Sequence, residues 1–128
     1  MGDIRTFTDL DVWKKGHTLV ISVYMATKEF PPEERYSLSD QMRRSAVSTT
    51  SNIAEGFGRQ TYREKIQFYY IASGSLTELK NQLFVAKDVQ YISIKRFNEL
   101  MDIADDTRRL LNGLLRKTKS ILTSNSNI

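Results

Sequence analysis

Residues 97–121 read FNELMDIADDTRRLLNGLLRKTKSI, and apolar or small uncharged side chains recur in this stretch at alternating spacings of three and four. The recurring positions are Phe97, Leu100, Ala104, Thr107, Leu111, Leu114, Thr118 and Ile121. Because an α-helix has about 3.6 residues per turn, these positions fall on one face. The pattern predicts a helix over 94–121 that buries one side. Its average period is typical of helices packed at about +20° in bundles.

The same rhythm occurs in three earlier segments, which are separated by helix-breaking residues. The three further helices are expected over residues 9–29, 38–57 and 62–90. Pro31 and Pro32 end the first of them, since proline cannot donate a backbone hydrogen bond and restricts the residue before it. Gly56 and Gly58 end the second, and we expect one of them in a left-handed C-terminal conformation.

Hydroxyl residues mark the expected helix starts. Each of three pairs places an acidic residue three positions after a hydroxyl, namely Thr8 with Asp11, Ser37 with Asp40, and Thr61 with Glu64. This spacing is typical of a capping box, in which the hydroxyl accepts a hydrogen bond from a free backbone amide of the first turn. Ser93 is the expected cap of the last helix.

The four segments together predict an all-α fold. Short connections make successive helices antiparallel neighbours, so we expect an antiparallel up-down four-helix bundle. The 128 residues suit one domain, expected over 1–122. The tail over 123–128 lacks an apolar pattern and is expected to fray.

Composition limits the classes of function. The chain has no cysteine, which excludes disulfides and thiolate metal sites. It shows no signal peptide and no apolar run long enough to span a membrane, so we expect a cytoplasmic protein. The formal net charge is +4, and no acidic residue follows Asp106. The basic residues in that last part are Arg108, Arg109, Arg116, Lys117 and Lys119.

A stripe of mostly small polar residues runs beside the apolar line of the second helix. It consists of Gln41, Ser45, Ser48, Asn52 and Glu55, and it continues to Arg59. Ser, Thr and Asn are weak helix formers, so a packing reason is expected for them. One interpretation is a seam against another helix of the bundle or of a neighbouring subunit. The alternative is an ordinary exposed face.

Basic residues flank this stripe and the turn after it. They are Arg43, Arg44, Arg59, Arg63 and Lys65. Guanidinium groups bind phosphate oxygens in a fork, and the start of the third helix adds partial positive charge, so a phosphate-binding patch is one interpretation. Solvated side chains with local ion pairs to Glu55 and Glu64 are the other.

The sequence favours no enzymatic chemistry. His17 is the only histidine and falls on the apolar side of the first helix, where we expect a packed or boundary residue. No Glu-x-x-His pair is present for a metal site in a bundle. The glycines at 56 and 58 follow a helix and not a strand, unlike those of a nucleotide-binding loop. We expect no catalytic residue, no metal and no cofactor.

Three blocks of sequence carry a family resemblance. They are FTDLDVW at 7–13, QMRR at 41–44 with NIAEG at 52–56, and ASGSL at 72–76 followed by Glu78 and Leu79. Their order and spacing resemble the four-helix bundle proteins encoded in intervening sequences of bacterial 23S rRNA genes. The resemblance implies an up-down bundle that forms homo-oligomers, typically pentamers. It also implies a relationship to the accessory variability determinant proteins of diversity-generating retroelements, which bind nucleic acid through basic surface.

Two hypotheses for the function follow. The first is an oligomeric protein that binds RNA or a nucleoprotein through the basic residues named above. The second is a protein-interaction scaffold without nucleic-acid binding, in which charge serves solubility. Residues 68–70 are all aromatic and span about 200° of the helix, so some aromatic surface is left exposed unless a wide bundle interface absorbs it. No aromatic platform for stacking a nucleic-acid base is evident from the sequence.

Overall fold

The structure is a computed structural model that describes residues 2–126. Within this range it contains four α-helices, two 3-10 helices and no strand. The elements in chain order are η1 (Phe7–Asp9), α1 (Asp11–Thr27), η2 (Pro32–Glu34), α2 (Leu38–Gly58), α3 (Tyr62–Asp88) and α4 (Ile94–Ser126). The prediction of an all-α bundle is confirmed.

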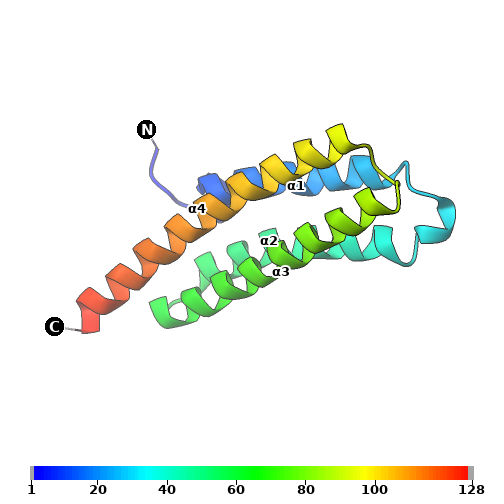
Figure 1. The fold of residues 1–128 in the computed structure, drawn as a ribbon. Helices are drawn as coiled ribbons and strands as arrows, with labels where there is room; N and C mark the ends of the chain where they lie inside the picture. The colour runs from blue at the N-terminus through cyan, green and yellow to red at the C-terminus, as the bar shows by residue number, and fades with distance from the viewer. Residues whose placement is uncertain (1, 127–128) are drawn as a thin grey trace.

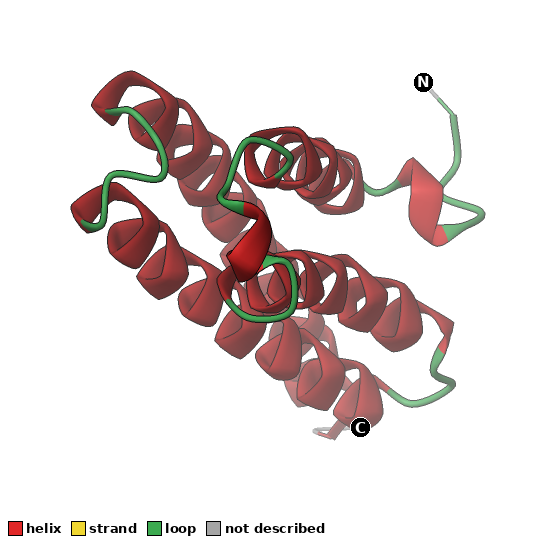
Figure 2. Cartoon of the chain, turned by 90° about the vertical axis from the view of Figure 1, so that its right-hand side faces the viewer, coloured by secondary structure: helices red, strands yellow, loops and turns green. Residues whose placement is uncertain are grey.

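The four helices pack in a closed ring. Contacts join α1 to α2, α2 to α3, α3 to α4 and α4 back to α1. Figure 1 shows the α1–α2 and α3–α4 connections at one end of the bundle and the α2–α3 turn at the other. Figure 2 views the bundle from the end that carries η2. The short connections therefore place successive helices side by side and antiparallel, as expected.

The core is made by the apolar lines that the spacing predicted. The α3 line is at most 1% exposed at every position, namely Tyr69, Ala72, Leu76, Leu79, Leu83 and Ala86. On α4, Phe97, Leu100 and Leu111 are buried, but the line then moves from Leu114 to Leu115. This shift is the drift expected when a helix of about 3.6 residues per turn follows a 3.5 repeat.

Two of the predicted caps are present. The Thr61 hydroxyl accepts a hydrogen bond from the Glu64 amide at 3.2 Å, and the hydroxyl also donates to the Glu64 carboxylate at 2.8 Å. The Ser93 hydroxyl accepts from the Arg96 amide at 3.0 Å. Both residues satisfy amides that have no partner within the helix.

The two other predicted capping boxes are wrong. At the first, Asp9 accepts from the amides of Arg5 and Thr6 at 2.9 and 3.0 Å, which builds the separate turn η1 before α1. At the second, the acceptor is the Glu34 carboxylate and not the Ser37 hydroxyl. It accepts a hydrogen bond from the Leu38 amide at 3.1 Å. A carboxylate four residues away reaches the free amides because η2 turns the chain back.

The helix ends also differ from expectation. No described glycine adopts a positive φ, so the expected left-handed glycine at the end of α2 is wrong. The left-handed residue is Gln90, with φ of 65°, where the Tyr91 amide bonds the Ala86 carbonyl and closes α3. The last helix was expected to end at 121, yet α4 continues to Ser126 because neither glycine nor proline follows Gly113. Residues 127–128 of the expected frayed tail lie outside the described residues.

Among residues 2–126, no helix is long and apolar enough to cross a membrane. The longest, α4, carries charged residues along most of its length.

Candidate nucleic-acid interface

The polar stripe of α2 divides into a packed middle and exposed ends. Ser45 is 5% exposed, and the Ser48 hydroxyl lies 2.8 Å from the Ser75 hydroxyl on α3. The Asn52 amide donates to the carbonyl oxygen of Ser48 at 2.8 Å. Gln41 and Glu55 are exposed. The middle of the stripe therefore forms a seam between α2 and α3, where small side chains allow close approach and polar groups find partners.

The two arginines beside the stripe have different surroundings. Arg43 Nε donates to the Thr27 hydroxyl on α1 at 2.8 Å, and its guanidinium lies 4.9 Å from the ring centroid of Tyr24. Arg44 pairs with Asp40 one turn earlier at 2.9 Å, and its side chain is 80% exposed. Arg43 thus holds α1 against α2, whereas Arg44 makes only a surface pair.

Changing these two arginines separately should distinguish a structural role from a surface role. Arg43→Ala removes a charged hydrogen bond and a cation–π contact, so we expect a loss of about 2 kcal/mol in the free energy of unfolding. Arg44→Ala should cost less than about 0.5 kcal/mol, as is usual for exposed pairs. Urea denaturation measures both. Equal losses for the two variants would contradict the assignment of Arg43 to the α1–α2 contact.

Arg108 is also bound between helices. Its guanidinium donates to the Ser73 carbonyl oxygen at 3.2 Å and to the Thr77 hydroxyl at 2.6 Å, both on α3. Arg109 points elsewhere and pairs with Asp106 at 3.0 Å. These contacts leave Arg108 little freedom to reach a phosphate.

Two basic residues at the turn between α2 and α3 are bound to groups of these two helices. Arg59 pairs with Glu55 at 2.7 Å, and its guanidinium lies 4.5 Å from the ring centroid of Phe68. Lys65 Nζ donates to the Phe57 carbonyl oxygen at 2.6 Å. Partial burial lowers the pKa of the Lys65 amine. Lys65 therefore satisfies the C-terminal carbonyls of α2, a role in which a cation is favoured.

One group of exposed basic side chains without an ion pair in the described part of the chain lies at one end of the bundle. Arg63, Arg116 and Lys117 are exposed and form no ion pair within the described residues, and exposed Lys119 lies 4.6 Å from the ring centroid of Tyr70. We call the surface formed by these four cations the basic end. In Figure 1 the later part of α4, coloured orange to red, lies at the same end as the α2–α3 turn.

The distribution of acidic residues makes this end distinct. Residues 55–65 and 110–128 together hold six basic and two acidic residues, whereas the rest of the chain holds 13 basic and 13 acidic. Two of the three aspartates of α4 are matched, since Asp105 binds Lys80 at 2.6 Å and Asp106 lies between Lys15 and Arg109. The excess positive charge of the protein is therefore concentrated near the basic end.

The dipole of α4 does not explain these cations. A helix dipole favours positive side chains within about the last turn. Because α4 continues to Ser126, Lys119 lies seven residues before its end, and the last turn carries no basic residue. The three α4 cations of the basic end therefore lie outside the turn in which the helix dipole would favour them.

The aromatic side chains of residues 68–70 separate as the helix geometry requires. Tyr69 is 1% exposed, and burial raises the pKa of its hydroxyl to about 12. Tyr70 is 49% exposed on the α3 surface that faces Lys119. The expectation that some aromatic surface is left exposed is thus met by Tyr70.

His17 is not packed in the core. It is exposed on α1, and its ring stacks on that of Trp13 with centroids 4.7 Å apart. The two residues are one turn apart on the helix, so the stack is a local contact. Among the described residues, no group of His, Asp and Glu side chains could hold a metal ion.

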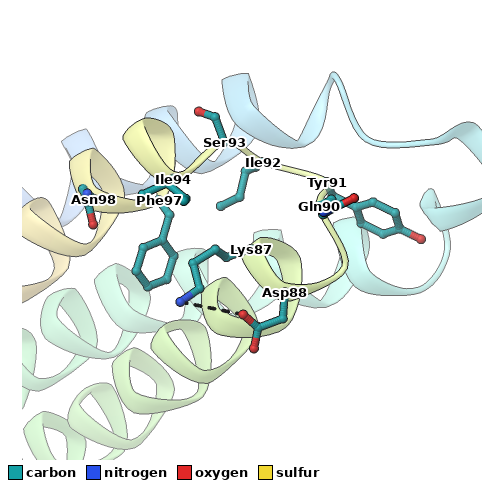
Figure 3. Close-up of a pocket in the computed structure, with 9 residues that line it drawn as sticks. All are labelled: Lys87, Asp88, Gln90, Tyr91, Ile92, Ser93, Ile94, Phe97 and Asn98. Atoms are coloured by element: carbon teal, nitrogen blue, oxygen red, sulfur yellow. Dashed lines mark ion pairs between the residues drawn. The ribbon is translucent and has the colours of Figure 1, made fainter.

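An open depression lies at the other end, around the α3–α4 turn (Figure 3). Lys87 Nζ lies 3.7 Å from the Asp88 carboxylate and 4.7 Å from the ring centroid of Phe97. Ile94, at its rim, is 70% exposed. The lining mixes apolar and polar side chains, and its one lysine is paired with its one aspartate, so it does not add to the basic end.

Comparison with known protein families identifies one family that matches most of the chain. Residues 8–113 match the family described as 23S rRNA-intervening sequence protein. The chain belongs to this family. The family match covers η1 in part, α1, α2, α3 and most of α4, and it ends before Arg116. The resemblance found in the sequence blocks is therefore confirmed, while Arg116, Lys117 and Lys119 lie outside the matched range.

A solved structure agrees with the fold of this family member. It is a protein of unknown function from the S23 ribosomal protein family of Bacteroides thetaiotaomicron, 20% identical to this chain. The similarity has a TM-score of 0.76 and covers 81% of this chain and 97% of the other. At this identity the likeness supports the bundle fold alone. No curated protein matches the chain.

Proposed function

We propose that this member of the 23S rRNA-intervening sequence protein family is a non-enzymatic RNA-binding protein that uses the basic end to bind phosphates. The observation that carries the proposal is the set of exposed, unneutralised cations on α3 and α4 (Arg63, Arg116, Lys117 and Lys119). Phosphate contacts by such side chains release condensed counterions, which provides most of the sequence-independent affinity for nucleic acids.

The ten basic residues that the sequence offers as candidate RNA contacts have different surroundings in the structure. Arg43, Arg59, Lys65 and Arg108 make contacts within the bundle, and Arg44 and Arg109 have acidic partners on their own helices. Within the described residues, Arg63, Arg116 and Lys117 have no such partner, and Lys119 contacts the Tyr70 ring but no acidic group. They are therefore the residues that we propose to contact RNA.

A salt titration tests the proposal. Fluorescence anisotropy of a labelled single-stranded RNA should report binding that weakens as salt rises. Four phosphate contacts per protomer predict a slope of log K against log salt of about −3, at about 0.7 per phosphate for single strands. Absence of binding at about 50 mM salt would contradict the proposal and would favour the protein-interaction scaffold.

We further propose that the protein acts as a homo-oligomer. Large apolar side chains are half exposed on the outer surfaces of α1 and α3, among them Ile21, Met25 and Ile71. Ile21 and Met25 lie one turn apart on α1, so a second copy that packs against this face of α1 would bury both side chains. Light scattering coupled to size exclusion should give a multiple of 14.8 kDa, fivefold for the pentamer that the resemblance implies. A particle of 14.8 kDa would contradict self-assembly.

A further inference from the structure

Tyr70 combines exposure with a fixed position. It is 49% exposed, and the Lys119 ammonium of the neighbouring helix lies 4.6 Å from its ring centroid. Such a cation–π contact holds the ring between α3 and α4. A ring that is held in place yet still half exposed loses little conformational freedom when a flat partner covers it.

The surroundings of Tyr70 are positive. Arg63 lies two helical turns before Tyr70 on α3, about 10 Å along the helix axis. Arg116 lies one turn before Lys119 on α4, about 4.5 Å along its axis. Both arginines are exposed, so a chain that crosses the Tyr70 ring meets cations on either side of it.

We propose that Tyr70 stacks an unpaired base of the bound RNA, while Lys119 and its basic neighbours hold the adjoining phosphates. This inference rests on the proposed RNA binding and adds the class of RNA, namely a single strand or a loop. Aromatic side chains in a basic groove are the means by which proteins bind single strands without reading their sequence.

A duplex fits this surface less well. Inside a double helix the base faces are covered by their neighbours in the stack, so only the two end pairs present a face to a protein ring. The cations alone would hold duplex and single strand by their phosphates. The exposed Tyr70 ring adds an interaction that only an unpaired base can make, so loops and single strands should bind more tightly than a duplex of equal charge.

The test compares two RNAs and three variants. The RNAs are a single strand of mixed sequence and a blunt duplex with the same number of phosphates. Tyr70→Ala should weaken binding of the single strand about 10-fold, as alanine substitution of a stacking residue usually does, and should leave the salt slope unchanged. The same variant should weaken duplex binding by less than about 2-fold, because the duplex binds through its phosphates and makes little use of the ring. Tyr70→Phe keeps the ring and should bind like the wild type.

Phe84→Ala is the matched control. Phe84 is also exposed on α3, at 45%, and also has a lysine nearby, with Lys87 5.1 Å from its ring centroid. It lies 14 residues further along the helix, toward the opposite end of the bundle, so its loss should not change RNA binding. This control separates the loss of a stacking ring at one site from a general effect of removing surface aromatics.

The outcomes separate this inference from the function on which it rests. Binding of single strands by the wild type with no loss in Tyr70→Ala would overturn the stacking role and leave RNA binding intact. Equal weakening of duplex and single strand would also overturn it, because the ring would then serve only to position Lys119. If neither RNA binds the wild type, the proposed function fails and the stacking site with it.

Discussion

Gly56→Leu should destabilise the bundle strongly, with a loss of about 3 kcal/mol in the free energy of unfolding. A Cβ atom at position 56 would lie 2.7 Å from Cε1 and 2.9 Å from Cδ1 of Tyr69. Both distances are shorter than normal van der Waals contact, and a leucine adds three more carbons in the same place. Because domains of this size are stable by only about 5–15 kcal/mol, the loss is a large share of the total.

The ring of Tyr69 cannot move aside easily. It is 1% exposed and belongs to the core cluster that also contains Ile53, Ala72 and Leu111. Cores are packed to the density of organic crystals, so a displaced ring forces its neighbours out of favourable rotamers. The midpoint of thermal unfolding should therefore be lower in Gly56→Leu than in the wild type. The circular dichroism signal of the helices, recorded as temperature rises, measures it.

Alanine substitutions at the two glycines of α2 provide a matched control. Gly56→Ala should destabilise the protein although alanine is the better helix former, whereas Gly58→Ala meets no atom within 4 Å and should be neutral or stabilising by up to about 1 kcal/mol. In a Tyr69→Leu background the cost of Gly56→Ala should fall, since the ring is gone. An unchanged cost in that background would show that the Gly56–Tyr69 contact is not the cause.

Neutralising the α4 part of the basic end should have the largest effect on RNA binding. With Arg116, Lys117 and Lys119 all changed to glutamine, three phosphate contacts are lost. At about 0.7 per contact, the slope of log K against log salt should become less steep by about 2, and affinity at about 0.1 M salt should fall about 100-fold. Fluorescence anisotropy with a single-stranded RNA measures both quantities.

A second triple variant controls for net charge. Lys28, Arg35 and Lys95 are exposed at the opposite end of the bundle, near the α1–α2 and α3–α4 connections. Their joint change to glutamine removes the same three charges. Binding should fall by less than about 5-fold, since only the long-range field of the protein changes. Similar losses in both triple variants would mean that RNA responds to overall charge and has no preferred surface.

Several parts of the fold could be predicted because they depend on short-range spacing. The alternation of three and four residues predicted which side of α3 is buried, and the core positions from Tyr69 to Ala86 lie there. Thr61 and Ser93 were correctly predicted as caps, because a cap is formed within one turn of the chain. The capping boxes at Thr8 and Ser37 were predicted wrongly. The Asp9 carboxylate accepts from the amides of Arg5 and Thr6 in the turn before α1, and the Glu34 carboxylate, not the Ser37 hydroxyl, accepts from the Leu38 amide at the start of α2.

The candidate site was less predictable than the fold. The sequence showed that the chain has no acidic residue after Asp106, and this feature of α4 is still the basis of the proposed RNA surface. It did not show that Arg43 and Arg108 are bound to other helices, because their partners lie 16 and 35 positions away. Tyr70 was not evident as a platform for the same reason, since the contact with Lys119 joins residues on different helices.

The sequence by itself therefore determined the four helices, the sides that they bury and the segments where positive charge accumulates. Each of these properties depends on residues within a few turns of one another. The tertiary structure decided which arginines are bound to other helices, why a side chain at position 56 would press on Tyr69, and which tyrosine of α3 stays exposed. These depend on the rotation and register of one helix against the next, which are set by the packing of the whole core.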